Sequence, residues 1–146
     1  MALNPNCTLI GVIGGKGGVG KSVFAANFAV ALMNELRTQV LLIDGDSKTI
    51  GDQNFLLGQK PNKTLKEITT MATGLAATPL NQLVNMHPSG LGYLGAVRGP
   101  EEKLDVNPEA LMRQIEFFSR QFKFIVVDLG NDIGPLQNAF LLEATD

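Results

Sequence analysis

The chain has one cysteine, a net charge of −2 and no long apolar run, and each scarcity excludes a class of protein. The single cysteine, Cys7, cannot form an intrachain disulfide and is interpreted as structural or incidental. No apolar run approaches the roughly 18 residues of a membrane-spanning helix. No positive charge precedes the first apolar stretch at Leu9, as a secretory signal would require. The charge balance argues against a broadly basic nucleic-acid surface, so the sequence predicts a cytoplasmic protein.

Length and composition fit one globular domain over residues 1–146. Apolar residues make up 45% of the chain and charged residues 18%, which is typical of a folded rather than a disordered protein. The chain is long enough to bury a real core. Its only histidine, His87, follows Met86 in a turn without a neighbouring carboxylate or cysteine, so it is assigned no ligand or base role.

The most informative stretch runs from Gly15 to Ser22 and reads Gly-Lys-Gly-Gly-Val-Gly-Lys-Ser. A short apolar run, Leu9 to Ile13, precedes it, and a helical pattern from Ser22 to Leu36 follows. Apolar residues recur at helical spacing in that pattern at Phe24, Phe28, Ala31 and Leu32. In such a strand, glycine loop and helix, successive backbone N–H groups can close around an anion at the positive end of the helix dipole. The arrangement predicts a phosphate cradle.

The complete G-x-x-x-x-G-K-S pattern in this setting favours a nucleoside triphosphate ligand over a simple tight turn. Lys21 is expected to reach the β and γ phosphates as a point charge, and the Ser22 hydroxyl to bind Mg²⁺. The residues expected to contact the nucleotide are Gly15, Lys16, Gly17, Gly18, Val19, Gly20, Lys21, Ser22 and Val23.

The run Lys16 to Ser22 has a lysine at its start as well as near its end, and it resembles the deviant Walker A motif of the ParA/MinD group of P-loop ATPases. In that family the first lysine crosses a dimer interface and touches the partner's nucleotide. The resemblance therefore implies this catalytic role for Lys16, with ATP as the nucleotide and a nucleotide-dependent homodimer. Nitrogenase iron proteins and iron-sulfur carrier ATPases share a similar loop but need clustered cysteines, which this chain lacks.

A continuous apolar run, Val40 to Ile43, predicts a strand buried on both faces of a parallel sheet, and Asp44-Gly45-Asp46 follows it. Carboxylates at the C-terminal end of a parallel strand point into the crevice where ligands bind. In the ParA/MinD group the second aspartate of this pattern helps to position the attacking water. The resemblance thus implies a catalytic role for Asp46 and a supporting role near the metal for Asp44. The alternative is that both aspartates only cap a turn.

A second apolar strand, Phe122 to Leu129, contains Asp128 near its end in the Walker B arrangement. Asp128 is expected to hold Mg²⁺ directly or through water, so the predicted metal ligands are Ser22, Asp44 and Asp128. Gly130 and Asn131 replace the proline that many relatives place after this aspartate.

The stretch Leu41 to Gly58 resembles the CpaE and TadZ pilus-assembly branch of the family most closely. Partitioning members usually have Pro-Gln after the second aspartate, where this chain has Ser47-Lys48. The implied partner is a pilus-assembly or polar-localisation protein, with recruitment to the cell pole or the inner membrane face. Arg98 follows a predicted strand at the ligand edge, and it is read either as a contact to nucleotide or partner or as a surface arginine.

The remaining pattern alternates helices and strands. Short helices are predicted over 64–70, with Thr64 and Glu67 as a capping box, and over 79–84. Residues 71–78 are predicted to have little order, and 91–97 to form a strand whose Gly92 and Gly95 allow close packing against a helix or ligand. Helices are also predicted over 108–121 and 136–144, the first with a core stripe formed by Leu111, Ile115, Phe118 and Phe122.

These elements predict an α/β, mostly parallel, doubly wound P-loop domain of the SIMIBI type, with helices on both faces. The resemblance implies that the chain is the N-terminal two thirds of a family domain, with an exposed sheet edge that favours self-association. The expected activity is slow or partner-stimulated ATP hydrolysis that controls the position of a partner machine. Two alternatives remain open: a non-hydrolysing nucleotide-binding localisation scaffold, and a partition or division-site positioning ATPase.

Overall fold

The computed structural model describes residues 3–15, 20–46, 52–71, 74–99 and 101–144. Within them, five strands form one sheet in the order β1-β5-β2-β4-β3. The strands are β1 (Thr8–Ile13), β2 (Val40–Asp44), β3 (Asn85–Met86), β4 (Gly92–Leu94) and β5 (Phe124–Gly130). The helices are α1 (Lys21–Leu36), α2 (Asp52–Leu57), α3 (Leu65–Thr69), α4 (Leu80–Leu83), α5 (Pro108–Ser119) and α6 (Pro135–Glu143), with a 3-10 turn η1 (Leu75–Ala77). The strands pair in parallel except for β3 and β4.

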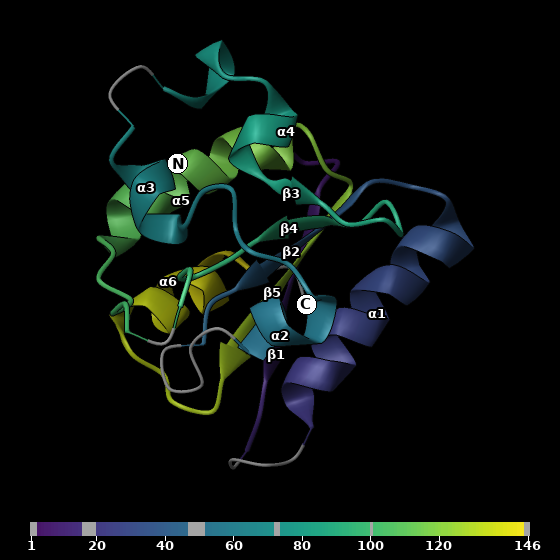
Figure 1. Cartoon of the computed structure of the whole chain (residues 1–146), viewed down its shortest axis with the longest axis horizontal. Helices are drawn as coiled ribbons and strands as arrows, with labels where there is room; N and C mark the ends of the chain where they lie inside the picture. Colours follow the sequence, from purple (N-terminus) through teal and green to yellow (C-terminus); the bar gives the residue numbers. More distant parts are fainter. Residues whose placement is uncertain (1–2, 16–19, 47–51, 72–73, 100, 145–146) are drawn as a thin grey trace.

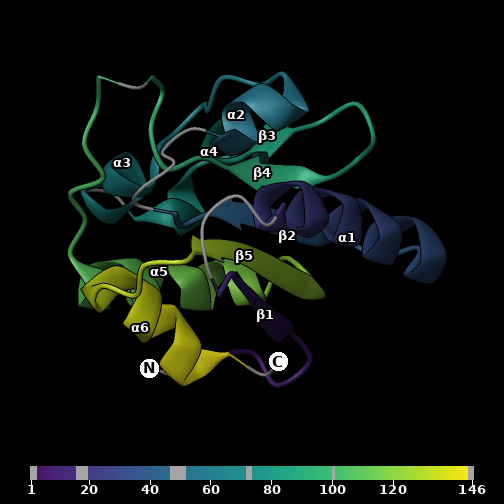
Figure 2. The same ribbon diagram turned by 90° about the horizontal axis from the view of Figure 1, so that it is seen from below.

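Helices cover both faces of the sheet, which confirms the predicted doubly wound arrangement. Helix α1 lies on one side of the strands, and α3, α5 and α6 lie on the other (Figure 1). The view turned by 90° shows the strands in sequence from β3 and β4 to β1, which forms one edge of this sheet (Figure 2). Leu42 packs with the residues under α1, whereas Leu41 and Ile43 pack with those under α5. This alternation explains why all five residues of β2 are buried.

Helix α1 packs on the sheet mainly through small residues. Its buried residues are small or flexible: Ala25, Ala26, Ala29 and Met33. Phe24 is 57% exposed and stacks on Phe28, with ring centroids 5.5 Å apart. Small side chains let the helix axis approach the sheet closely, so the alanine face packs inward and Phe24 remains outside. The predicted helix is confirmed, and of the four apolar residues that indicate it, Phe28 and Leu32 pack against the core while Phe24 and Ala31 are exposed.

The segment between α3 and β4 contains more structure than the sequence predicts. Leu75–Ala77 forms the turn η1, and Leu75 is buried, so the prediction of little order over 71–78 is wrong for these residues. Asn85–Met86 pairs with β4 as an antiparallel strand that has no signal in the sequence, because a two-residue strand is too short to show periodicity. The strand predicted over 91–97 is confirmed, but its regular part is only Gly92–Leu94.

Several local predictions are confirmed. Thr64 and Glu67 form the capping box at the start of α3, with the Thr64 side chain accepting from the Glu67 N–H. The stripe on α5 is core, since all four predicted residues are buried: Leu111, Ile115, Phe118 and Phe122. Cys7 is also buried, and burial raises the pKa of its thiol, as expected for an inert structural cysteine. Among the described helices, none has the length and apolarity needed to cross a bilayer.

Gly95 is required by the packing at the end of β4. A Cβ at this position would overlap Pro61 and lie 3.0 Å from Asn54 Oδ1. Overpacking of this kind costs about 1–3 kcal/mol, so Gly95→Ala is expected to lower the urea midpoint of unfolding measured by circular dichroism. Gly15→Ala is the control, because a Cβ there meets no atom of the described residues within 4 Å. An unchanged urea midpoint in Gly95→Ala would show that the residues around position 95 move to accommodate the methyl group without a loss of stability.

Candidate nucleotide-binding site

The site lies at the carboxyl edge of the neighbouring parallel strands β2 and β5. Asp44 and Asp128 are direct partners in the pairing of β2 with β5, so their side chains start from the same level of the sheet. Both residues are fully buried. The Gly45 N–H donates to the Asp128 carbonyl oxygen at 2.8 Å, which continues the pairing past the end of β2. The two aspartates that the sequence assigns to the metal are thus brought together, although 84 positions separate them (128 − 44).

Lys21 and Asp46 form an ion pair at this edge. Lys21 Nζ lies 3.0 Å from Asp46 Oδ2, and the two side chains are 13% and 3% exposed. Lys21 is the first residue of α1, and Gly20 before it has a φ of 78°, a conformation in which glycine is strongly favoured. The predicted phosphate-binding lysine and the predicted water-orienting aspartate therefore lie in direct contact.

Gly130 shapes the position of Asp46. It has a φ of 76°, and a Cβ built on it would lie 2.5 Å from Asp46 Oδ1. Any larger residue would displace the carboxylate from its place beside Lys21. The glycine at position 130 thus has a structural consequence, because it leaves room for Asp46 against the end of β5.

Sequence reasoning missed two buried glutamines in the site. Gln53, on α2, donates from Nε2 to Asp128 Oδ2 at 2.9 Å and to the Ser22 carbonyl at 2.8 Å. Gln137, on α6, donates from Nε2 to the Gly45 carbonyl at 2.8 Å. Neither residue lies in a motif with a fixed pattern, so only its place in the fold identifies it. Both amides stabilise the backbone or carboxylates from which the site is built.

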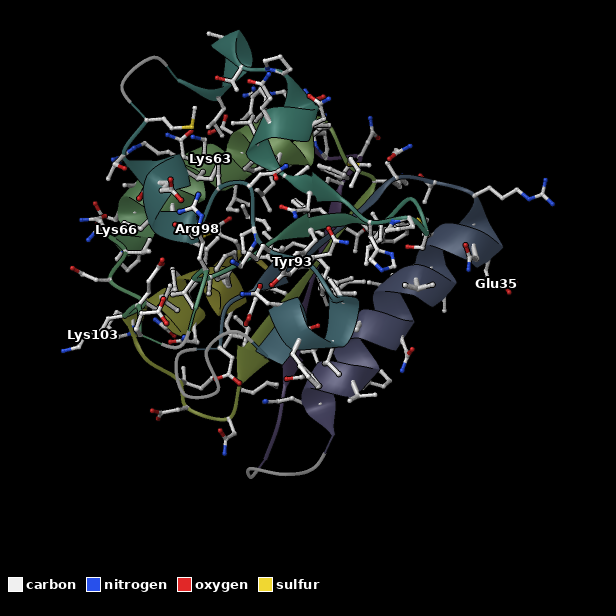
Figure 3. All side chains as sticks on the ribbon, in the orientation of Figure 1. Glu35, Lys63, Lys66, Tyr93, Arg98 and Lys103 are labelled. Atoms are coloured by element: carbon white, nitrogen blue, oxygen red, sulfur yellow. The ribbon has the colours of Figure 1, made fainter. Side chains whose placement is uncertain are left out.

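Tyr93, on β4, is a fully buried tyrosine. Figure 3 shows it near the middle of the molecule. Its hydroxyl donates to Asn54 Oδ1, and Asn54 Nδ2 donates to the Val97 carbonyl at 2.7 Å. Burial, reinforced by the carboxylates of Asp44 and Asp128, raises the pKa of Tyr93. The phenol therefore remains a hydrogen-bond donor and ties α2 to the end of β4.

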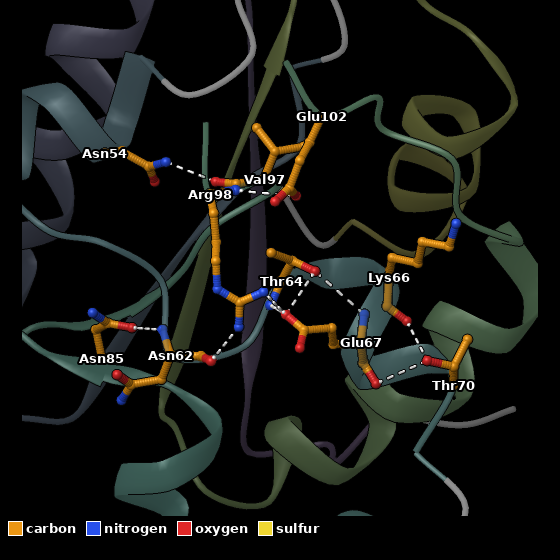
Figure 4. A network of polar contacts seen from close by, with 10 residues as sticks. All are labelled: Asn54, Asn62, Thr64, Lys66, Glu67, Thr70, Asn85, Val97, Arg98 and Glu102. Carbon is orange, nitrogen blue, oxygen red and sulfur yellow. Dashed lines mark hydrogen bonds and ion pairs between the residues drawn. The ribbon is translucent and has the colours of Figure 1, made fainter. Parts of the chain in front are cut away.

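Arg98 is held by neighbouring segments of the chain (Figure 4). It forms an ion pair with Glu67, and its Nη2 donates to the Asn62 carbonyl at 2.8 Å. Burial raises the pKa of Glu67, but the hydrogen bonds from Arg98 and Thr64 outweigh this effect, and the net pKa is lowered. Of the two readings left open for Arg98, the structure supports a surface arginine with a local structural role, since its guanidinium braces the capped start of α3.

The remaining predicted residues lie in the loop and the first turn of α1. Ser22 and Val23 follow Lys21 on the helix, and Gly15 and Gly20 flank the loop. Lys16, Gly17, Gly18 and Val19 lie outside the described residues, as do Ser47 and Lys48. The assignments of Lys16 to a partner's nucleotide and of the loop amides to the phosphates stay predictions.

The residues present fit a magnesium ion better than a transition metal. In the described part of the chain there is no group of three or more histidine, cysteine, aspartate or glutamate side chains that could hold a metal by itself. Two buried carboxylates, with Ser22 linked to Asp128 through Gln53, instead provide hard oxygen donors, and Mg²⁺ typically takes one or two carboxylates together with substrate phosphates and water. The donor set matches a cation that arrives with a nucleotide.

The sheet order, the helix α1 that begins at Lys21, and the carboxylates at the edge define a P-loop nucleoside triphosphatase fold of the ParA/MinD type. Residues 10–126 match the CbiA family, described as the CobQ/CobB/MinD/ParA nucleotide binding domain, and the chain belongs to this family.

The known proteins that are similar to the chain include the following three. Antiactivator FleN of Pseudomonas aeruginosa is 28% identical over 141 residues, which are 94% of this chain and 48% of FleN. The crystal structure of a ParA family ATPase from Chlorobium tepidum TLS has a TM-score of 0.80 and 26% identity, covering 95% of this chain and 58% of that chain. The septum site-determining protein MinD from Pyrococcus horikoshii, complexed with Mg-ADP, shares the fold with a TM-score of 0.73 and 24% identity, covering 94% and 55%. This chain thus spans about half the length of these relatives.

Proposed function

We propose that the chain binds ATP with Mg²⁺ and hydrolyses it slowly or on stimulation by a partner. The observation that carries the proposal is the contact of Lys21 with Asp46 directly beside the paired carboxylates of Asp44 and Asp128. A lysine at the start of a helix, two buried acidic residues and a third carboxylate on the lysine provide the charges that phosphoryl transfer requires.

The proposed roles follow from this geometry. Lys21 would leave Asp46 and hold the β and γ phosphates, while the released carboxylate of Asp46 would orient the attacking water. Ser22, Asp44 and Asp128 would hold Mg²⁺, which supplies positive charge to the transferring phosphoryl group. Lys16 would add a second ammonium from a partner copy in a nucleotide-dependent homodimer. The MinD from P. horikoshii is complexed with Mg-ADP, which supports an adenine nucleotide with Mg²⁺ as the ligand of this chain.

The proposed output is a nucleotide-controlled switch that positions or regulates a protein partner. Segments near the γ phosphate order and release binding surfaces in such switches. A pilus-assembly role at the cell pole or inner membrane face depends on the likeness of residues 41–58 to the CpaE and TadZ branch, and residues 47–51 of that stretch are not described. The similarity to FleN, an antiactivator, favours a second candidate in which the switch opposes an activator protein. A third candidate function of the same nucleotide switch is partition or division-site positioning.

Isothermal titration of ATP with Mg²⁺ into the chain tests the central proposal, and a phosphate-release assay on the same sample tests hydrolysis. Saturable binding at one site per chain, followed by release of phosphate, is expected. Binding without release would favour the non-hydrolysing localisation scaffold. The absence of binding would contradict the proposed function.

A further inference from the structure

Gln53 is a fully buried polar side chain that joins three elements of the site. It lies on α2, and its Nε2 donates both to Asp128 Oδ2 on β5 and to the Ser22 carbonyl on α1, at 2.9 and 2.8 Å. These partners are 75 and 31 positions away in the sequence. A single amide group thus links the two segments that supply Asp128 and Ser22.

The chemistry of the partners fixes the orientation of the Gln53 amide. A carboxylate oxygen and a carbonyl oxygen both accept hydrogen bonds, so only the NH₂ group of the glutamine can face them. Its oxygen, Oε1, is then buried with no hydrogen-bond partner within the part of the chain that the structure describes. Leaving a buried acceptor unsatisfied costs about 1–3 kcal/mol, which an apolar side chain of similar size would avoid. A purely structural role therefore does not explain why this residue is a glutamine and not an apolar residue of similar size.

The two donated hydrogen bonds have a specific consequence for Asp128. Its Oδ2 is held by Gln53, and its Oδ1 accepts a longer bond of 3.4 Å from the Gly130 N–H. A carboxylate held on one oxygen by a donor has a fixed direction and lower rotational freedom. Because the same amide holds the backbone of Ser22, it also sets the spacing between the first turn of α1 and the end of β5. A buried acceptor such as Gln53 Oε1 is satisfied when a bound ligand or hydrated ion supplies the missing donor.

We infer that Gln53 is a positioning residue for the magnesium site, which orients the Asp128 carboxylate and holds it at a set distance from Ser22. The inference rests on the proposed function, because Asp128 and Ser22 are metal ligands only if the chain binds a nucleotide with Mg²⁺. Partners of metal-ligating carboxylates contribute to affinity because they restrict the ligand to its binding geometry, and their loss typically weakens metal affinity by about 10- to 100-fold.

The test compares the Mg²⁺ dependence of nucleotide binding in the wild-type chain and in Gln53→Met, which keeps most of the side-chain volume and removes the amide. Binding of a fluorescent ATP analogue is measured in EDTA and then across a Mg²⁺ titration. The variant is expected to bind the metal-free nucleotide as the wild type does, but to need about tenfold more Mg²⁺ for the same gain in affinity.

Asn85→Leu is the matched control for the removal of a buried amide. Asn85 lies on β3, at the opposite edge of the sheet from β1, and hydrogen-bonds to Gln59, Lys60 and Asn62. The Asn85→Leu substitution is expected to lower the stability of the fold without changing the Mg²⁺ dependence of nucleotide binding. An unchanged Mg²⁺ dependence in Gln53→Met, or an equal weakening of binding with and without Mg²⁺, would overturn the inference while the proposed function stands. Failure of the wild-type chain to bind the nucleotide would overturn both.

Discussion

Replacement of Lys21 by methionine is expected to lower the affinity of the chain for ATP·Mg²⁺ by about 10- to 100-fold. A hydrogen bond to a charged group contributes about 1.5–3 kcal/mol, and each 1.4 kcal/mol changes a dissociation constant tenfold. The Lys21 side chain is only 13% exposed, so water screens its charge less than on an open surface. Methionine keeps the apolar stem and removes the ammonium. Isothermal titration gives the two dissociation constants directly.

A second variant separates this effect from a loss of stability. Lys21→Met leaves the buried carboxylate of Asp46 without the ammonium that now lies 3.0 Å away, and breaking a buried ion pair from one side is strongly destabilising. In Lys21→Met/Asp46→Asn the charge imbalance is removed, so stability is expected to recover while binding remains weak. If the double variant recovers binding as well, Lys21 acts on the fold and not on the phosphates.

Asp46→Asn is expected to reduce phosphate release by about 10²- to 10⁴-fold, the usual contribution of a positioned acid–base group, while ATP·Mg²⁺ binds at least as tightly as before. Binding is preserved because the substitution removes the carboxylate that competes with phosphate for Lys21. The neutral amide has nearly the same shape, so it fits the space beside Gly130. A phosphate-release assay and a titration on the same samples measure both quantities.

Asp132→Asn provides the comparison for Asp46→Asn. Asp132 follows β5 at the same edge of the sheet but is exposed, and its substitution also removes one negative charge. An equal gain in ATP affinity in both variants would indicate a general electrostatic effect rather than competition for Lys21. Unchanged phosphate release in Asp46→Asn would remove this residue from the catalytic step.

The elements that the sequence predicts well are those with strong local signals. The buried strands β2 and β5 are predicted from largely apolar runs. The start of α3 has Thr64 and Glu67 at the spacing of a capping box. Such signals depend only on residues a few positions apart. The helical pattern of α1 did not indicate which of its faces packs on the sheet, because the buried face consists mainly of alanines that carry no strong apolar signal.

The sequence by itself determined the α/β class, the glycine loop between β1 and α1, and the placing of Asp44 and Asp128 at strand ends, because chain order and local pattern are sufficient for each. Only the tertiary structure decided that Asp44 and Asp128 share one level of the sheet, that Lys21 contacts Asp46, and that Gln53 links α1 to β5. These contacts depend on which strands become neighbours and on how closely the helices pack. Both are set by burial across the whole domain, which no short segment encodes.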